Sequence, residues 1–82
     1  MSDERHMVTS PLMGTFYSAP APGEKNFVEI GQRVSGEDVV CVIESMKIFT
    51  ELKADRPGTV TRIMAENEDM VMKNQELIEI KV

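Results

Sequence analysis

Turn-forming residues interrupt this chain so often that no stretch of helical period between them is long enough to predict a helix. Each turn segment contains Pro, Gly or Asn, and they fall at residues 20–25, 35–38, 55–58 and 66–69. Short segments of strand character surround them, at residues 7–10, 14–16, 39–43, 50–53, 58–63 and 77–80. This spacing predicts an all-β sandwich or barrel, and 82 residues allow one small domain.

A faint internal repeat divides the chain into two halves. Gly14-Thr15 recurs as Gly58-Thr59, at an offset of 44. The apolar pattern at positions 34, 40 and 43 recurs at positions 71, 77 and 80, at an offset of 37. The smaller offset indicates about seven extra residues in the first half. They fit within residues 17–25, where two prolines and a glycine favour a protruding, stiff loop.

Glycines mark equivalent places in the two halves. We expect Gly14 and Gly58 to permit close backbone approach. We expect residues 66–69 to form a turn matching the one at Gly31, with Asn67 able to take the left-handed conformation.

The junction of the two halves falls at Lys47. It lies between the segments 39–43 and 50–53, which are close enough to form a hairpin with Ser45, Met46 and Lys47 near its tip. A tight hairpin favours Asn-Gly, Asp-Gly or Gly there, because its central residues need positive φ. This tip has none of them, and a broken local rule at an exposed turn indicates a functional site.

Composition excludes several classes of function. A net charge of −5 with scattered Lys and Arg argues against a nucleic-acid partner. With one His (His6) and one Cys (Cys41), we expect no catalytic triad, metal site or internal disulfide. Cys41 lies in the longest apolar run, residues 39–43, and is expected to be a buried core thiol. That run is too short to cross a membrane, and no secretory signal is apparent.

The first seven residues are polar and unpatterned. We therefore expect residues 1–7 to be a flexible lead-in or an expression remnant, and residues 8–82 to form the domain.

The motif Glu44-Ser45-Met46-Lys47 resembles the attachment site of biotin-dependent carboxylases, whose usual form is Glu-Ala-Met-Lys. The similarity includes Ser10-Pro11-Leu12-Met13-Gly14-Thr15-Phe16-Tyr17, Gly31-Gln32-Arg33-Val34 and Gly58-Thr59-Val60, and covers about residues 8–80. It implies a biotinyl/lipoyl-like domain, a flattened barrel-sandwich hybrid of two antiparallel sheets with a quasi-twofold repeat. It also implies biotin attached covalently to Lys47.

The resemblance extends to the residues around Lys47 and to the insertion. It implies recognition by a biotin protein ligase through Glu44, Ser45, Met46 and Ile48, although a solvated hairpin residue remains an equal alternative for Glu44. The insertion resembles the thumb of the carrier subunits of bacterial and plastid acetyl-CoA carboxylases. That likeness places near the biotin ring Ser18, Ala19, Pro20, Ala21, Pro22, Gly23, Glu24 and Lys25.

Two positions depart from the pattern of that family. Ser45 replaces the usual Ala, a change between small residues that should leave the turn intact. Ala19 stands where a thumb often has Thr, so its side chain offers no hydrogen bond to the biotin ureido group.

The resemblance implies a non-catalytic carrier with the chemistry supplied by the cofactor and its partners. A biotin protein ligase would attach biotin to Lys47, and biotin carboxylase would load a carboxyl group from bicarbonate. A carboxyltransferase would then pass that group to acetyl-CoA, giving malonyl-CoA for fatty acid synthesis. The expected location is the bacterial cytoplasm or the plastid stroma.

Two other functions compete with this interpretation. A lipoyl carrier domain shares the fold but usually has Asp-Lys-Ala at the tip, where this chain has Met46-Lys47-Ile48. A β interaction module without a cofactor would leave the glycine-free tip and the two-half pattern unexplained.

Overall fold

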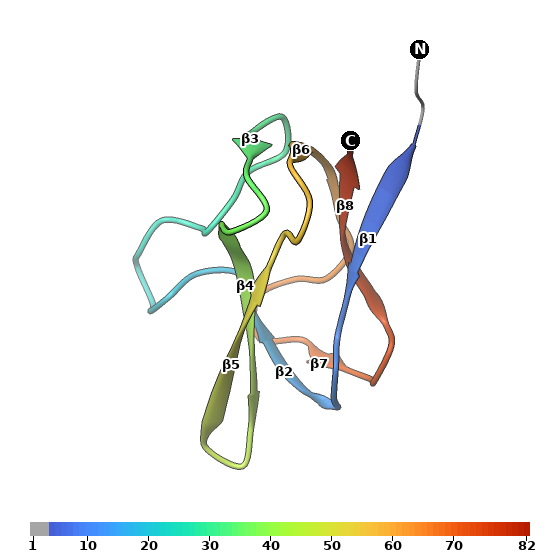
Figure 1. Ribbon diagram of the computed structural model, residues 1–82. Helices are drawn as coiled ribbons and strands as arrows, with labels where there is room; N and C mark the ends of the chain where they lie inside the picture. The colour runs from blue at the N-terminus through green and yellow to red at the C-terminus, as the bar shows by residue number, and fades with distance from the viewer. Residues whose placement is uncertain (1–3) are drawn as a thin grey trace.

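The computed structural model describes residues 4–82, which form eight strands and, over that range, no helix (Figure 1). One antiparallel sheet has the order β1 (Arg5–Thr9), β8 (Glu76–Lys81), β6 (Gly58–Ile63) and β3 (Arg33–Val34). The other has the order β5 (Ile48–Lys53), β4 (Val39–Ser45), β2 (Gly14–Tyr17) and β7 (Met70–Val71). The predicted all-β fold of two antiparallel sheets is confirmed.

The start of the domain differs from the prediction. β1 begins at Arg5, so residues 5–7 belong to a strand and not to a lead-in, while residues 1–3 lie outside the described residues. Arg5 pairs with Lys81, His6 with Ile80 and Met7 with Glu79. This pairing with a distant strand orders a segment whose own sequence lacks a strand pattern.

The strands β3 and β7 were also not predicted. Each has two residues, too few for alternation to be recognised. They form because β6 and β2 offer them backbone partners.

The two sheets are related by the repeat that the sequence indicated. β1, β8, β6 and β3 correspond to β5, β4, β2 and β7, in the same order across each sheet. Hydrogen bonds repeat as well: Gly31 N donates to Val60 O (2.8 Å), and at matching positions Glu68 N donates to Phe16 O (2.6 Å). The interval from Tyr17 to Arg33 is longer by the predicted seven residues than the interval between the corresponding residues of the second half, Thr61 and Met70.

The turn in the second half uses a different residue from the one expected. Glu68 has φ 75° and corresponds to Gly31, whose φ is 94°; Asn67 is not among the residues with positive φ. The side chain of Asn67 instead accepts a hydrogen bond from Ser18 N (3.0 Å). Asn67 therefore holds the base of the first-half loop, while Glu68 takes the left-handed position.

The close approaches expected at two glycines are confirmed. A Cβ at Gly14 would lie 2.5 Å from Glu44 O and 2.8 Å from Ile43 Cγ2. A Cβ at Gly58 would meet the corresponding atoms, Lys81 O and Ile80 Cγ2.

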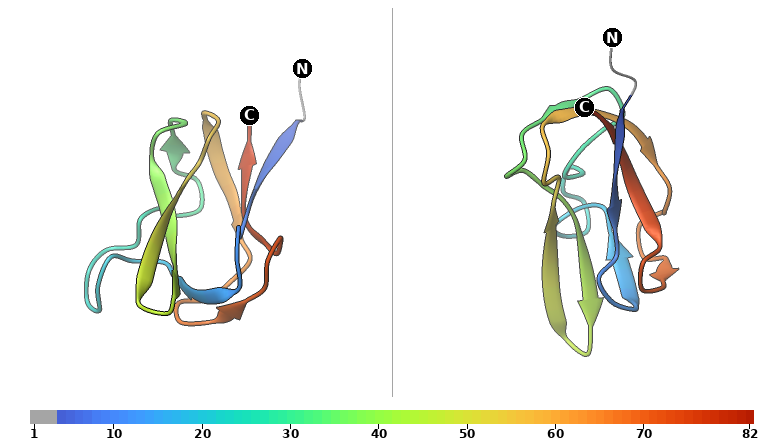
Figure 2. Two further views of the ribbon diagram at one scale, coloured as in Figure 1. Left: turned by 60° about the horizontal axis from the view of Figure 1, so that its bottom comes forward. Right: turned by 45° about the vertical axis from the view of Figure 1, so that its right-hand side comes forward.

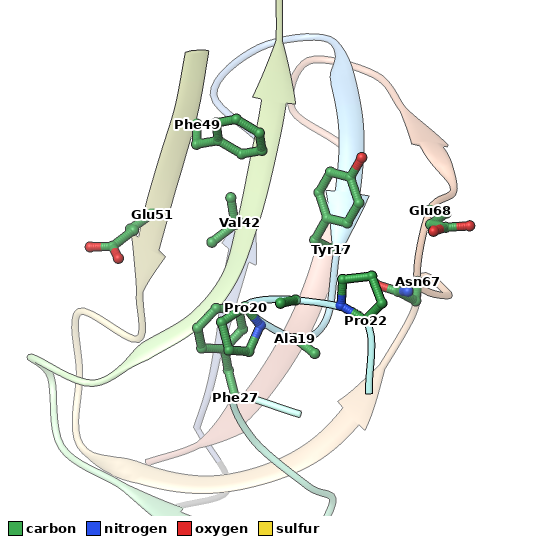
Figure 3. Close-up of a pocket in the computed structure, with 11 residues that line it drawn as sticks. Tyr17, Ala19, Pro20, Pro22, Phe27, Val42, Phe49, Glu51, Asn67 and Glu68 are labelled. Atoms are coloured by element: carbon green, nitrogen blue, oxygen red, sulfur yellow. The ribbon is translucent and has the colours of Figure 1, made fainter. Parts of the chain in front are cut away.

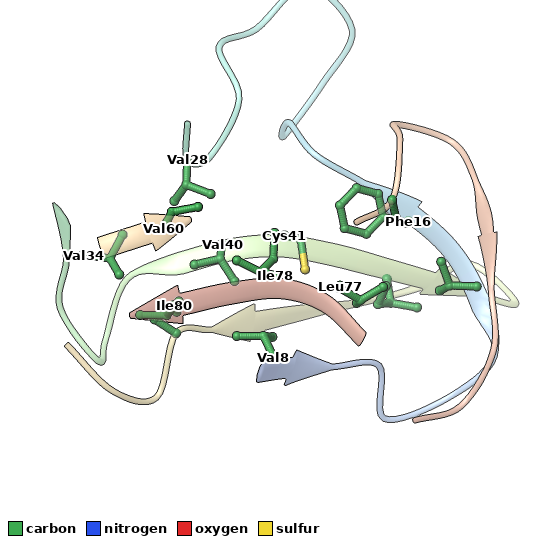
Figure 4. Packing of buried hydrophobic residues seen from close by; sticks show 14 residues of the cluster. Val8, Phe16, Val28, Val34, Val40, Cys41, Val60, Leu77, Ile78 and Ile80 are labelled. Atoms are coloured by element: carbon green, nitrogen blue, oxygen red, sulfur yellow. The ribbon is translucent and has the colours of Figure 1, made fainter. Parts of the chain in front are cut away.

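The core fills the space between the sheets with apolar side chains from both halves (Figure 4). The largest fully buried ones are Phe16, Ile43, Leu77, Ile78 and Ile80. A register shift between Val39 and Cys41 interrupts the alternation of β4, so Val40 and Cys41 both join the core. Cys41 is fully buried as predicted, and burial raises the pKa of its thiol to about 12.

The β4–β5 hairpin extends beyond the other strands at the end opposite both termini (Figures 1 and 2). In the other half the position of its turn is taken by the two ends of the domain, where Val82 N donates to Glu4 O (3.1 Å). The hairpin tip therefore lies at the opposite end of the domain from both termini (Figure 1).

Candidate functional site

The tip of the β4–β5 hairpin is a two-residue turn made of Met46 and Lys47. Ser45 pairs with Ile48, and both central residues have positive φ, 51° for Met46 and 65° for Lys47. These signs are those of a type I′ turn, which normally contains Asn and Gly. Left-handed φ costs a residue other than Gly about 1–2 kcal/mol. The structure thus places Lys47 at a strained tip, as the sequence predicted.

Glu44 closes this turn from within the hairpin. Lys47 N donates a hydrogen bond to Glu44 Oε2 (2.9 Å). A carboxylate is a strong acceptor for a backbone N–H, so this bond offsets part of the strain at the tip. Glu44 therefore has a structural task, in addition to any role in recognition.

The side chains at the tip project into solvent. Met46 is 91% exposed, and Lys47 is also exposed. Within residues 4–82, no hydrogen bond or ion pair engages Lys47 Nζ. The amine is accessible to solvent, and a group attached to it would extend from the end of the hairpin.

The predicted thumb is a loop between β2 and β3, and it projects from the side of the molecule (Figure 2). Its base is closed by a hydrogen bond from Phe27 N to Ser18 O (2.8 Å). At its far end Glu24 N donates to Ala21 O (3.1 Å), and Gly23 has φ 80°. Backbone hydrogen bonds and prolines together give this loop a defined shape.

A hollow of about 890 Å³ lies between the thumb and the outer face of the sheet that carries the hairpin (Figure 3). The thumb contributes Ala19, Pro20, Ala21 and Pro22 to its wall. The remaining lining residues are Tyr17, Phe27, Val42, Phe49, Glu51, Asn67 and Glu68. The predicted thumb residues Ser18, Gly23, Glu24 and Lys25 do not line it.

Val42 is an apolar residue of the sheet that lines the hollow together with the thumb. It is 9% exposed, yet it does not belong to the core cluster between the sheets. Its side chain faces the hollow, close to those of Tyr17 and Phe49 in Figure 3. The rings of Tyr17 and Phe49 are 6.4 Å apart, a distance at which aromatic rings attract one another. This apolar wall spans β2, β4 and β5, and the last two of these strands form the hairpin that carries Lys47.

The sheet-side wall of the hollow was not predicted from the sequence. Tyr17, Val42 and Phe49 come from three adjacent strands, and no local pattern brings them together. Of these three residues only Val42 could have been recognised from the sequence, because an apolar residue on the outer face of a strand is expected to be covered by other side chains.

Residues 4–82 contain no group of three His, Cys, Asp or Glu side chains placed to hold a metal ion. In the same range there is no helix with the length and apolar character needed to cross a membrane.

Comparison with known sequences identifies one family. The family described as "Biotin-requiring enzyme" matches residues 6–80. The biotin carboxyl carrier protein of acetyl-CoA carboxylase from Nostoc sp. is 50% identical over 74 residues, covering 90% of this chain and 41% of that protein. The protein of the same name from Haemophilus influenzae is 41% identical over 76 residues, covering 93% of this chain and 49% of its own length. This chain therefore spans less than half of either relative.

The fold also matches a solved structure. The urea carboxylase of Kluyveromyces lactis aligns with a TM-score of 0.78 and 28% sequence identity. The alignment covers 98% of this chain and 6% of that much larger one.

Proposed function

This chain belongs to the family of biotin-requiring enzymes, and from that premise we propose that it carries biotin attached covalently to Lys47 Nζ. The observation that supports this site best is the position of Lys47. Its amine is exposed, makes no hydrogen bond or ion pair within residues 4–82, and lies at the end of the β4–β5 hairpin, on a turn whose residues are strained. Because this turn is strained and its amine, within that range, makes no contact that stabilises the fold, a role in covalent attachment explains it better than a role in folding.

The attachment step is an acyl transfer to the lysine amine. The neutral Nζ attacks the carbonyl carbon of biotinyl-adenylate in the active site of a biotin protein ligase. An amide bond forms, AMP leaves and the amine loses a proton, so Lys47 loses its positive charge. Glu44 keeps the turn closed, Ser45 and Ile48 form its last strand pair, and Met46 is the most exposed side chain beside the reacting amine.

The thumb hollow suits the bicyclic ring of biotin. The ring has an apolar face and a polar ureido edge, and the hollow combines Tyr17, Phe49 and the thumb prolines with the polar side chains of Asn67 and Glu68. Ala19 lines it without a hydroxyl, so Asn67 and Glu68 are the candidate polar partners of the ureido edge. In this position the ring would be partly shielded from water between visits to partner enzymes.

The proposed role is that of a non-catalytic carrier in acetyl-CoA carboxylase. Bound biotin would supply the ring nitrogen that receives and releases a carboxyl group. This chain would deliver it from biotin carboxylase to the carboxyltransferase that makes malonyl-CoA for fatty acid synthesis, because tethering raises the local concentration at both sites. Relatives from bacteria and chloroplasts support a bacterial cytoplasmic or plastid location.

The test is co-expression with a biotin ligase, followed by intact and peptide mass measurement. We expect a single biotinyl addition on the peptide containing Lys47. Lys47→Arg should abolish it, whereas Lys73→Arg, which alters another exposed lysine, should not. Absence of any addition under conditions that modify a known carrier would refute the proposal, and a lipoyl addition would favour the lipoyl carrier instead.

A second experiment tests delivery. The biotinylated chain is mixed with biotin carboxylase, carboxyltransferase, ATP, bicarbonate and acetyl-CoA, and malonyl-CoA is measured. Product that depends on Lys47 supports the assignment to acetyl-CoA carboxylase, and loaded carrier without product contradicts it.

A further inference from the structure

Exposed apolar side chains gather at the hairpin end of the molecule. Within residues 4–82, seven large hydrophobic side chains are exposed, and one of them, Ile30, lies apart in the loop before β3. The other six, here called the hairpin-end surface, are Met13, Met46, Ile48, Phe49, Met70 and Met72. Such a concentration on a small soluble domain marks an interaction surface.

Strand register places members of this surface on one face of the sheet, although they come from segments distant in sequence. Phe49 pairs with Glu44, Glu44 with Thr15, and Thr15 with Met70, so the four form one row across β5, β4, β2 and β7. Paired residues share a face of the sheet, with Cβ atoms about 5 Å apart. This row lies on the same face as Tyr17 and the thumb hollow.

The surface continues beyond that row toward the tip. Gly14 and Val71 are paired, and Met13 and Met72 adjoin them at the ends of their strands. The hairpin tip with Lys47 lies beside the same strand ends, because Gly14 is next to Thr15, the partner of Glu44. Four of the six members are methionines, whose flexible thioether side chains adapt to a partner.

Carboxylates border this surface. Glu44 lies within the row, Glu51 follows Phe49 on the same face, and Glu68 and Asp69 directly precede Met70. Within the described part of the chain, the positively charged residues adjacent in sequence to members of this surface are Lys47 and Lys73, two against these four carboxylates. A partner that fits would present an apolar contact surrounded by basic side chains.

We propose that the hairpin-end surface is the docking surface for the biotin ligase that acylates Lys47, and that it extends beyond the hairpin to Met13, Met70 and Met72. This inference rests on the proposed attachment of biotin to Lys47. Any enzyme whose active site encloses Lys47 Nζ must cover the surface around the tip. A specific interface involves about 800 Å² on each partner, far more than a two-residue turn provides. The exposed methionines on and after β7 and before β2 extend the apolar area beyond the hairpin.

The test is steady-state biotinylation of the whole chain by the ligase, with the carrier concentration varied. Met70→Lys removes an apolar contact and adds a charge that a basic partner repels, while Met70→Gln removes only the contact. Ile30→Lys is the matched control, because Ile30 is 65% exposed and Met70 66%. We expect Met70→Lys and Met72→Lys to raise the KM for the carrier at least tenfold with little change in kcat. Met70→Gln should raise it less, and Ile30→Lys should leave it unchanged.

Each alternative outcome counts against the proposal. Wild-type KM in both lysine variants would overturn it, and so would an equal rise in KM for Ile30→Lys. If the variants are acylated normally but fail to deliver carboxyl groups to the transferase, the surface serves that enzyme and the assignment to the ligase is wrong. Unchanged thermal unfolding of all variants shows that altered KM does not reflect misfolding. If the wild-type chain receives no biotin at all, the proposed function itself has failed, a result distinct from the others.

Discussion

Glu44 and Lys47 are linked across the hairpin tip, where the backbone N–H of Lys47 donates to Glu44 Oε2 at 2.9 Å. The residue that would carry the cofactor is thus held by the first residue of its own motif. The sequence left two tasks open for Glu44, recognition by the ligase or an ordinary solvated position. The hydrogen bond from Lys47 N gives Glu44 a local structural role, and this role is compatible with both alternatives.

Replacing Glu44 with Ala should therefore destabilise the hairpin. The Lys47 N–H loses a charged acceptor at a partly exposed site, and we expect the free energy of unfolding to fall by about 1 kcal/mol. Glu44→Gln keeps an acceptor oxygen, so its free energy of unfolding should fall by less. Urea unfolding measures both, with Glu51→Ala as a control at an exposed carboxylate on β5. An equal loss in Glu44→Ala and Glu51→Ala would show that the bond contributes nothing.

Relieving the strain at Met46 should stabilise the protein and impair its modification. Met46 has φ 51°, and Asn adopts that conformation more easily than Met. Met46→Asn should raise the free energy of unfolding by about 0.5–1 kcal/mol. Its biotinylation rate should fall at least tenfold, because the exposed thioether next to Lys47 is removed. Met72→Asn, outside the turn, should bring no gain in stability, and a matching gain there would contradict the explanation.

Adding a methyl group at Gly58 should disrupt the contact between β6 and β8. The new Cβ would overlap Lys81 O and Ile80 Cγ2, which are fixed by the sheet and the core. We expect Gly58→Ala to lower the free energy of unfolding by about 3 kcal/mol. Gly23→Ala is the control, since a Cβ there meets nothing within 4 Å and only its φ of 80° opposes it, at a cost of about 1 kcal/mol. Thermal or urea unfolding compares the two, and a similar loss in both would argue against steric overlap.

Ionisation of Cys41 should make stability depend on alkaline pH. Burial raises the pKa of the folded thiol from 9.0 to about 12. Below pH 9 the thiol is neutral in both states, so its contribution to stability is complete. Between pH 9 and 12 the unfolded chain loses this proton while the folded chain retains it, and stability declines as the pH rises.

The measurement is the difference between wild type and Cys41→Ala across this range, because the two proteins differ in no other ionisable group. The wild type should lose stability more steeply above pH 9. In the folded wild type, a thiol reagent at pH 8 should label Cys41 only as fast as the domain opens. Parallel stability curves, or labelling at the rate of a free thiol, would be inconsistent with a buried neutral thiol.

The six longer strands, the two halves, the glycine contacts and the place of Lys47 at the hairpin tip all followed from the sequence. Each depends on neighbours within a few residues or on a comparison of the chain with itself. A turn needs particular residues at fixed positions, a buried strand needs apolar ones, and a repeated contact needs a glycine in each half. Those requirements are local, so they can be recognised in the sequence alone.

Only the tertiary structure decided which distant residues meet. Residues 5–7 became a strand because β8 pairs with them, and Glu68 took the left-handed position while Asn67 bound the thumb. Val42 lines a hollow together with a loop that begins on another strand, and Met70 lies in one row with Phe49 across two intervening strands. These relationships depend on register between strands, which long-range packing sets and no local pattern encodes. The position of Lys47 at a hairpin tip could be predicted from the sequence, whereas the surfaces around it form only when the sheet folds.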